Sequence, residues 1–179
     1  MPESFPSAWV ERFASFVPAG GRILDVAAGR GRHTRFFRAL GHPVTAVDRD
    51  VSGLADLHDD AETTVIRADL ESGAPPPFAA ERFAGVVVAN YLHRPLLPAL
   101  VAAVAPGGAL IYETFAQGQE RFGRPRNPAF LLAPGELLDA VDGRLRVRAY
   151  EDMIQQAPTP AAIQRICATN SAGESRRST

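Results

Sequence analysis

Short apolar runs alternate along the chain with segments whose apolar positions follow a helical spacing. The apolar runs predict strands at 23–27, 44–47, 63–67, 83–89, 109–112, 144–150 and 161–168. The helical spacing predicts helices at 7–17, 32–40, 51–58, 95–105 and 134–143. Because strands and helices alternate over the first 115 residues, we expect an α/β fold, a doubly wound, mostly parallel sheet with helices on both faces.

The last two predicted strands are joined differently from the others. Pro158 and Pro160 lie in the connection between them, which is too short for a crossover helix. We therefore expect this pair to form an antiparallel hairpin. The segment 115–133 is rich in Arg, Gly and Pro, which predicts a long irregular loop.

The size and composition of the chain are those of one globular domain. It has 179 residues, of which 46% are hydrophobic and 22% are charged, as is usual for folded domains. We expect the domain to span residues 1–169, with an N-terminal helix at about 7–17. The polar residues 170–179 predict a disordered tail.

Charge and cysteine content exclude several classes of function. The formal net charge of −1 provides no general attraction to nucleic acid or to an anionic membrane. The single Cys167 excludes an internal disulfide and a multi-cysteine metal site, and we expect no metal. All 19 basic residues are arginine, which excludes Schiff-base and P-loop lysine chemistry. Without a membrane-length apolar run or a secretory signal pattern, the chain is expected to be cytoplasmic.

The segment from Asp25 to His33 is the strongest candidate for chemistry. It runs from a predicted strand into a predicted helix and contains Gly29 and Gly31, which let the backbone turn tightly and approach a ligand closely. The start of the following helix offers unpaired backbone N–H groups. Asp48 follows at the end of the next strand, about 20 residues beyond the loop, where a carboxylate accepts hydrogen bonds from ribose hydroxyls.

Two cofactor classes use a ribose-binding carboxylate at this place, and the glycine pattern distinguishes them. The NAD fingerprint requires a third glycine where this chain has Thr34. S-adenosylmethionine carries an amino group and a sulfonium but no pyrophosphate. The carboxylate of Asp25 would therefore attract its cationic end, whereas it would repel the phosphates of a dinucleotide. Asp69, just after the third strand, adds another acid near the same edge. An NAD(P)-binding Rossmann protein remains the alternative.

Over roughly residues 20–168 the chain resembles a class I S-adenosylmethionine-dependent methyltransferase. The run Leu24-Asp25-Val26-Ala27-Ala28-Gly29-Arg30-Gly31 is similar to the family's first motif, which usually has Gly-Cys-Gly or Ala-Cys-Gly where this chain has Ala28-Gly29 after Ala27. The run from Gly29 to His33 is most similar to the tellurite-resistance-type subgroup and other small-molecule methyltransferases, in which Asn often replaces His33. The resemblance implies a Rossmann-like, seven-stranded sheet in the order 3-2-1-4-5-7-6, with the last strand antiparallel.

The resemblance also implies which residues hold each part of the cofactor. Backbone around Ala27, Gly29 and Gly31 would hold the methionine part, and Asp48 the ribose. Asp69 and Leu70 would flank the adenine, and Asn90-Tyr91-Leu92-His93 would face the transferable methyl group. The expected cofactor-binding residues are Asp25, Ala27, Gly29, Gly31, His33, Asp48, Arg49, Asp69, Leu70, Asn90 and Tyr91.

Purely structural interpretations of four of these residues stay open. Asp25 and Asp48 could each cap the helix that follows it. Asp69 could be a solvated loop acid, and Asn90 could satisfy the backbone of a turn. The sequence alone does not choose between these roles and cofactor binding.

Methyl transfer is an in-line displacement that mainly requires alignment and exclusion of water. A general base is needed only if the acceptor must lose its proton first. His93 and Tyr91 are the expected catalytic residues, since both follow the fourth strand closely. A structural interpretation, in which His93 caps the helix at 95–105, is equally open. Further polar candidates near strand ends are His33, Tyr112 and Glu113.

The loop 115–133 lies where this family places acceptor-recognition elements. Arg121, Arg124 and Arg126 alternate there with Phe122 and Phe130. One interpretation is a lid that recognises anions through bidentate arginine contacts. The other is a solvated loop anchored by its two phenylalanines.

The sequence therefore predicts an enzyme that transfers a methyl group from S-adenosylmethionine to a small-molecule acceptor. The alternatives are an RNA or protein methyltransferase, an NAD(P)-binding protein, and a cofactor-binding protein without catalysis. Nucleic acid is disfavoured as a partner, because Asn90-Tyr91-Leu92-His93 lacks the prolines of the Asn-Pro-Pro-Tyr-like signature of many base-modifying enzymes. We expect no membrane partner, and a monomer or a homodimer.

Overall fold

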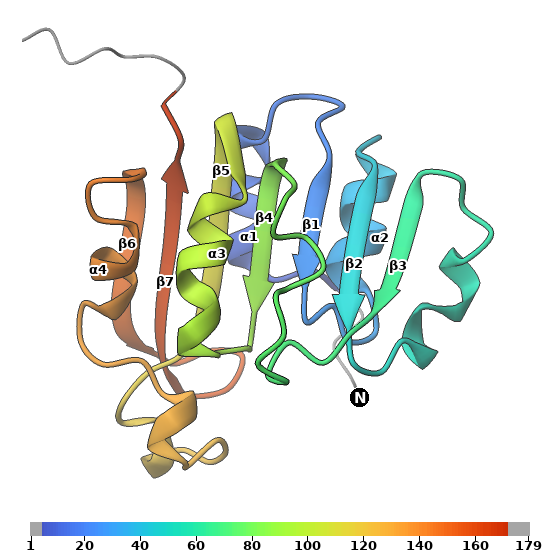
Figure 1. The fold of residues 1–179 in the computed structure, drawn as a ribbon. Coiled ribbons are helices and arrows are strands. Elements are labelled where there is room, and N and C mark those ends of the chain that lie inside the picture. The colour runs from blue at the N-terminus through green and yellow to red at the C-terminus, as the bar shows by residue number, and fades with distance from the viewer. Residues whose placement is uncertain (1–4, 172–179) are drawn as a thin grey trace, which may run out of the picture.

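One seven-stranded sheet forms the centre of the molecule, in the order β3-β2-β1-β4-β5-β7-β6 (Figure 1). The computed structural model describes residues 5–171. The strands are β1 (Ile23–Val26), β2 (Val44–Asp48), β3 (Thr63–Arg67), β4 (Phe83–Ala89), β5 (Val104–Phe115), β6 (Arg146–Gln155) and β7 (Ala161–Thr169). Strands β1 to β5 are parallel, and β7 is antiparallel to both β5 and β6. The predicted strand order and the antiparallel hairpin are confirmed.

Helices cover both faces of the sheet. The α-helices are α1 (Ala8–Phe13), α2 (Arg32–Ala39), α3 (Leu97–Ala102) and α4 (Glu136–Val141). Short 3-10 helices span Ala14–Phe16, Ser52–Leu57, Arg94–Leu96, Gln119–Arg121 and Pro128–Phe130. In Figure 1, α1 and α2 lie behind the sheet and α3 lies in front of it. Side chains of α4 share a core with those of α3.

The strand side chains alternate between the two faces and so supply two cores. On β4, Val86 and Val88 belong to the core that contains Leu100 of α3. The intervening Val87 belongs to the core that contains Trp9 of α1 and Phe37 of α2. Because both faces of the central strands are covered, those strands read in the sequence as continuous apolar runs.

The N-terminal helix is shorter than predicted. The Ser7 hydroxyl caps α1 by accepting from the backbone N–H groups of Trp9 (3.1 Å) and Val10 (3.2 Å). The α-helix ends at Phe13 and continues only as the 3-10 turn Ala14–Phe16. Trp9 anchors α1 to the sheet, since its indole N–H donates to the Ile166 carbonyl (3.2 Å).

Two predicted boundaries near β5 are wrong, namely the start of the fifth strand at 109 and the start of the tail at 170. The strand begins at Val104 and passes through the Pro106–Gly108 segment, although that segment has the composition of a turn. The Asn170 backbone N–H donates to Gly108 (2.9 Å), and the Asn170 side-chain amide donates to the Val104 carbonyl (2.9 Å). Pairing with the end of β7 therefore overrides the local turn preference and orders Asn170, which was assigned to the disordered tail. Residues 172–179 of that predicted tail lie outside the described residues.

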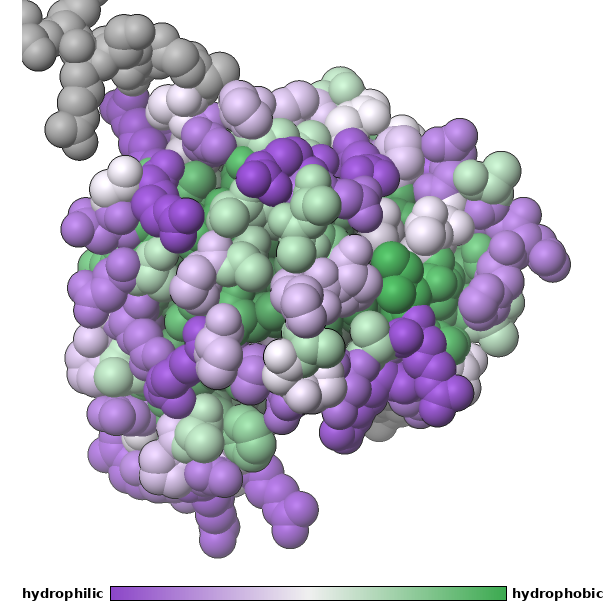
Figure 2. All heavy atoms as spheres, in the orientation of Figure 1, coloured by the Kyte–Doolittle hydropathy of each residue, from purple (hydrophilic) through white to green (hydrophobic). Residues whose placement is uncertain are grey.

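The connection between β3 and β4 contains a buried anchor and no helix. Phe78 is fully buried in this connection, under the core that α3 covers. In the space-filling view, apolar surface is visible over β2 and β3, and hydrophilic surface gathers below it, at the edge where β1 to β4 end (Figure 2). That edge is where open α/β sheets bind their ligands.

Candidate functional site

A cavity of about 390 Å³ opens at the carboxyl ends of the parallel strands. This volume falls in the range of roughly 300–1,000 Å³ that is typical of small-molecule sites. Its lining comes from four strand ends and from one distant loop: Ala27, Asp48, Arg49, Ala68, Asp69, Leu70, Glu71, Tyr91 and Phe130. Six of the predicted cofactor-binding residues thus lie around one space, namely Ala27, Asp48, Arg49, Asp69, Leu70 and Tyr91.

The turn after β1 has an unusual backbone. Ala27, Gly29 and Gly31 all have positive φ angles, of 54°, 55° and 74°. This left-handed conformation disfavours side chains by roughly 1–2 kcal/mol, so Ala27 is strained there. A Cβ added to Gly31 would lie 2.3 Å from the Leu54 Cδ2 atom, whereas one added to Gly29 would meet no atom within 4 Å. Gly31 is therefore required by internal packing, and the space beside Gly29 is open.

Asp48 faces this turn from the end of β2. Its Oδ2 atom accepts from the Gly29 backbone N–H (2.7 Å), and its Oδ1 atom accepts from the Asp50 backbone N–H (2.9 Å). Each carboxylate oxygen has a further lone pair. The carboxylate is thus oriented by the backbone while it lines the cavity, as a hydrogen-bond acceptor for a ligand must be.

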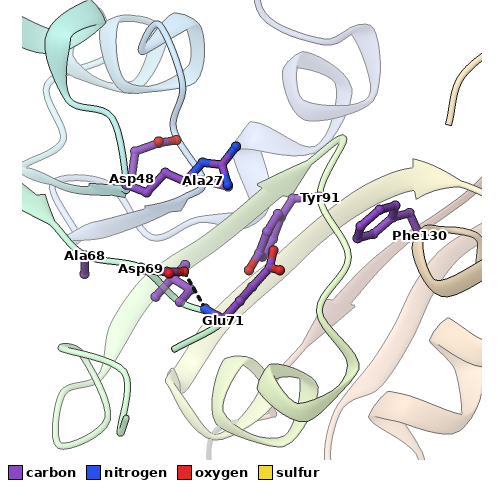
Figure 3. Close-up of a pocket in the computed structure, with 9 residues that line it drawn as sticks. Ala27, Asp48, Ala68, Asp69, Glu71, Tyr91 and Phe130 are labelled. Atoms are coloured by element: carbon purple, nitrogen blue, oxygen red, sulfur yellow. Dashed lines mark hydrogen bonds between the residues drawn. The ribbon is translucent and has the colours of Figure 1, made fainter. Parts of the chain in front are cut away.

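The segment after β3 provides two more carboxylates. The Asp69 Oδ1 atom accepts from the backbone N–H of Glu71 (3.0 Å), the contact dashed in Figure 3. In the same view the Glu71 carboxylate points toward Tyr91, with Phe130 beyond it. Asp69, Leu70 and Glu71 all line the cavity, and the exposed Asp69 therefore stands where a ligand in the cavity could reach it.

Asp25 is not among the described residues that line either cavity, so its placement gives no support to its predicted role in cofactor binding. Its side chain points under α2 and is only 2% exposed. The Thr34 hydroxyl donates to its Oδ2 atom (2.6 Å). Burial raises the pKa of Asp25 to about 6, although hydrogen bonds from Thr34 oppose that rise. The structural interpretation, in which this acid holds the start of the following helix, describes the contacts that are present. Sequence reasoning could not choose it, because the direction of the side chain depends on how α2 packs.

The buried acid makes a pH dependence testable. The pKa of Asp25 is raised in the folded state, so the folded protein binds this proton more tightly than the unfolded chain, and stability falls as pH rises from about 4 to 6. In Asp25→Asn this contribution is absent. The free energy of unfolding of the variant relative to the natural chain is expected to be higher at pH 7 than at pH 4, by on the order of 2 kcal/mol. Urea titrations of both proteins at the two pH values measure it, and a difference that stays constant would contradict the assignment.

His33 also lies apart from the cavity. Its side chain is 4% exposed, and its Nε2 atom accepts from the Ser7 backbone N–H (3.2 Å). Burial lowers the pKa of His33 to about 4, with a smaller contribution from Arg32. The neutral ring therefore joins the start of α1 to the start of α2. The placement of His33 gives no support to its predicted role in cofactor binding, because it lines neither cavity in the described part of the chain.

A second cavity, of about 260 Å³, adjoins the first. It is lined by Glu71, Asn90, Tyr91, Leu92, Thr114, Phe115, Pro125 and Phe130, and it shares Glu71, Tyr91 and Phe130 with the first cavity. Asn90 has a φ of 56°, so the backbone turns sharply as it leaves β4. This turn places Asn90 and Tyr91 at the cavity, where the sequence analysis expected the transferable group.

Tyr91 is held between the two cavities by its backbone. The buried Tyr112 hydroxyl donates to the Tyr91 carbonyl oxygen (2.8 Å). The Tyr91 hydroxyl oxygen is itself buried and makes no hydrogen bond of good geometry within the described residues. Burial raises the pKa of Tyr91 above its ordinary value, as does the nearby Glu71 carboxylate. Tyr112, one of the polar candidates for chemistry, is instead a residue that positions Tyr91.

The predicted catalytic residue His93 is not at either cavity among the described residues. It immediately precedes the 3-10 helix Arg94–Leu96, and its backbone carbonyl accepts from Leu96 (2.9 Å). The placement therefore gives no support to a catalytic role for His93. Glu113 was another candidate. Its Oε2 atom forms an ion pair with the Arg165 Nη1 atom (4.0 Å), on the neighbouring strand β7.

Arg94, which the sequence analysis did not single out, holds the loop that follows β5. Its guanidinium donates to both Glu136 carboxylate oxygens (2.7 and 2.9 Å). It also donates to the Ala129 carbonyl (2.9 Å) and the Leu131 carbonyl (2.8 Å). These two carbonyls flank Phe130, whose ring lines both cavities. Arg94 thus ties the loop to the β4 side of the site.

The loop arginines do not form an anion-binding lid at the cavities. Arg121, Arg124 and Arg126 are exposed and line neither cavity in the described residues, whereas Pro125 and Phe130 do. The loop is solvated, as the other interpretation holds, but its two phenylalanines are not buried anchors. Phe130 is 43% exposed, and Phe122 is 40% exposed with the Arg121 guanidinium over its ring.

Glu71, Phe130 and Arg94 are among the residues of the site that sequence reasoning missed, together with the lining residues Ala68, Thr114, Phe115 and Pro125. Glu71 follows the recognised pair Asp69-Leu70 directly, so its position carried a weak signal. Phe130 was noted only as an anchor of the loop. Among the residues described, no group of three or more His, Cys, Asp or Glu is arranged to hold a metal ion. No helix of the described chain is both long and apolar enough to cross a membrane.

Comparison with solved structures identifies the fold. The chain is similar to TehB from Haemophilus influenzae, with a TM-score of 0.70 and 16% identity over 91% of this chain and 61% of that one. It is similar to an S-adenosylmethionine-dependent methyltransferase from Mesorhizobium loti, with a TM-score of 0.67 and 17% identity over 90% of this chain and 98% of that one. A third similar structure is the 1,6-didemethyltoxoflavin-N1-methyltransferase of Burkholderia thailandensis, with bound S-adenosylhomocysteine. Its TM-score is 0.66, with 19% identity over 92% of this chain and 79% of that one.

Comparison with curated sequences gives a closer but partial match. The chain is 40% identical over 108 residues to the ribosomal protein L11 methyltransferases of Bordetella parapertussis and Bordetella bronchiseptica. The match covers 58% of this chain and 33% of each relative, so it spans about a third of their length. No family model matches the chain.

Proposed function

Because the chain has the fold of the class I S-adenosylmethionine-dependent methyltransferases, we propose that it binds S-adenosylmethionine and transfers the methyl group to a small-molecule acceptor. The observation that carries the proposal is the pairing of Asp48 with the glycine turn. The Asp48 carboxylate lines the cavity and is oriented by the Gly29 N–H (2.7 Å), next to a position where an added Cβ would meet no atom. A ribose-bearing ligand fits such an acceptor beside an open backbone turn.

The remaining lining residues support the same assignment. Asp69 and Leu70, which follow β3, offer an acceptor and an apolar side chain to the adenine. Ala27 and the turn that follows β1 would hold the methionine part. The acids that line the cavity outnumber Arg49, so the lining carries a net negative charge. This charge favours the cationic sulfonium over a pyrophosphate.

When bound, the sulfonium supplies an activated methyl group, and the chain has to align an acceptor with it and exclude water. Tyr91, Glu71 and Phe130 stand at the junction of the two cavities and so face both ligands. Neither His33 nor His93 lies there. Catalysis is therefore proposed to rest on placement by the Asn90–Tyr91 turn rather than on a histidine base.

Protein methylation is the second candidate, because the curated relatives with 40% identity are named as ribosomal protein L11 methyltransferases. An NAD(P)-binding protein is disfavoured by Thr34, whose hydroxyl is held by Asp25 where the dinucleotide fingerprint has its third glycine. A cytoplasmic location and a monomer or homodimer stay predictions.

Titration calorimetry with S-adenosylhomocysteine, and separately with NADH, tests the proposal. We expect saturable binding of the first compound and none of the second. Transfer of labelled methyl groups from S-adenosylmethionine is then measured into a small-molecule extract, into ribosomal protein L11 and into transfer RNA. Label in the small-molecule fraction supports the proposal, and label in L11 favours the second candidate. Absence of S-adenosylhomocysteine binding at millimolar concentration would contradict both.

Two glycine variants separate cofactor contact from folding. Gly29→Ala introduces a Cβ that meets no protein atom, so it costs about 1 kcal/mol of backbone strain. We expect S-adenosylhomocysteine affinity to fall by about tenfold as this Cβ obstructs the ligand. Gly31→Ala drives its Cβ into Leu54 at 2.3 Å, and we expect a loss of stability of about 2 kcal/mol.

Calorimetry and urea unfolding of both variants measure these effects. The Gly31→Ala variant is the control for strain at a positive φ angle, which both positions share. An unchanged affinity in Gly29→Ala would show that the ligand does not approach this turn.

A further inference from the structure

The second cavity carries a charge pattern that selects among acceptors. Glu71 is the one charged residue among the described residues that line it. The exposed arginines of the neighbouring loop, Arg121, Arg124 and Arg126, point elsewhere than into its lining. An anionic acceptor would thus meet the Glu71 carboxylate without a cationic partner in this lining, and in the adjoining first cavity Asp48 and Asp69 outnumber Arg49.

Half of the side chains that line this cavity contain a ring. Tyr91, Phe115 and Phe130 contribute aromatic rings and Pro125 contributes a pyrrolidine ring. Aromatic faces carry negative potential and attract cations, and they stack on planar ligands. The lining therefore suits a planar group that is neutral or positively charged.

Polar groups stand at the end of the cavity that adjoins the cofactor cavity. The Tyr91 hydroxyl is a buried donor with no hydrogen bond of good geometry in the described chain. The Glu71 carboxylate, an acceptor, points toward it (Figure 3). Both residues line both cavities, so an acceptor atom placed against them would lie next to the transferable methyl group.

We propose that the acceptor is a planar aromatic amine or nitrogen heterocycle, neutral or cationic, and that Glu71 determines its selection over anions of the same shape. This inference rests on the proposed function. In the transfer, the lone pair of an uncharged nitrogen of the acceptor forms a bond to the methyl carbon while the carbon–sulfur bond breaks and its electron pair stays on sulfur; any positive charge of the acceptor lies on another atom. The proton that the nitrogen then loses passes to Glu71 or to the water that reaches this exposed carboxylate.

A matched pair of probes tests the selection. Tryptamine and indole-3-propionate share the indole ring and the two-carbon chain, and they end in an ammonium and a carboxylate respectively. We measure the affinity of each by titration of the natural chain saturated with S-adenosylhomocysteine. Tryptamine is expected to bind about tenfold more tightly, because attraction of one probe and repulsion of the other by an exposed carboxylate add together.

The variants assign this preference to one residue. Glu71→Gln keeps the size of the side chain and is expected to bring the two affinities within about twofold of each other. Glu62→Gln, an exposed glutamate outside both cavities, is expected to leave the preference unchanged. A loss of folding would weaken the binding of both probes together, whereas the ratio of their two affinities reports the charge at the site.

Each other result overturns the inference. Equal binding of the two probes, tighter binding of indole-3-propionate, binding of neither, or a preference that survives Glu71→Gln would each contradict it. The same titrations are repeated without S-adenosylhomocysteine. If that compound does not bind, the proposed function fails on its own, and the ratio of the probe affinities still decides whether the cavity selects cations.

Discussion

Replacing Asp48 by asparagine is expected to weaken S-adenosylhomocysteine binding by about 10- to 100-fold, which corresponds to roughly 1.4–2.8 kcal/mol. Hydrogen bonds to a charged acceptor contribute about 1.5–3 kcal/mol each. Both oxygens of Asp48 are already oriented, one by the Gly29 N–H (2.7 Å) and the other by the Asp50 N–H (2.9 Å). An amide retains only one acceptor oxygen and turns an N–H₂ group toward a backbone donor.

The matched control for Asp48→Asn is Asp50→Asn, the same substitution two residues along the chain. The Asp50 carboxylate accepts from the Ser52 backbone N–H (3.0 Å) and is not among the residues lining the cavity. We expect calorimetry to find the natural affinity in Asp50→Asn, and urea unfolding to find both variants folded. If Asp48→Asn binds as tightly as the natural chain, the ribose is held elsewhere and the cofactor assignment loses its main support.

Replacing Arg94 by alanine is expected to lower the free energy of unfolding by about 3 kcal/mol. The substitution removes a bidentate pair with Glu136 and two hydrogen bonds to the Ala129 and Leu131 carbonyls. The Glu136 side chain is 18% exposed and would lose its cation. Because these contacts hold the segment that carries Phe130, the second cavity is expected to loosen while the part of the first cavity around Asp48 stays intact.

The measurements for Arg94→Ala are urea unfolding and affinity titrations with both ligands. Tryptamine affinity is expected to fall by about tenfold or more, and S-adenosylhomocysteine affinity by less than about threefold. Arg94→Lys keeps a charge without the planar fork, so its effects should be intermediate. Arg126→Ala, at an exposed arginine of the same loop, should change neither quantity. If Arg94→Ala lowered the affinity for tryptamine and for S-adenosylhomocysteine by the same factor, a local role for this residue would be contradicted.

The strands and the edge of the sheet that carries the cavity were predictable from local patterns, whereas the strand order was predicted from the resemblance to the class I methyltransferases. Apolar runs such as 83–89 are read from side-chain periodicity, and the hairpin of β6 and β7 follows from a connection too short for a helix. Asp48 and Asp69 were found because the ends of parallel strands meet at one edge of a sheet. For these residues, position along the chain determines position in space.

The direction of individual side chains was decided only by the tertiary structure. Asp25 and His33 belong to the recognised motif, yet both turn into the packing around α2 and α1. Tyr112 follows the same strand-end pattern, but its hydroxyl supports the Tyr91 backbone. Whether a polar side chain faces a ligand or a neighbour depends on which helix covers it, and no spacing within the sequence encodes that.

The sequence by itself determined the strands, the antiparallel hairpin and the turn with its two strand-end acids, since each depends on neighbours along the chain; the strand order came from the resemblance to a known family. Only the tertiary structure brought Glu71 and Phe130 to the same junction and placed Arg94 against the segment that carries Phe130. These residues come from three connections with no shared local pattern. Their meeting depends on the return of the loop after β5 to the β4 side, where the Arg94 guanidinium holds it.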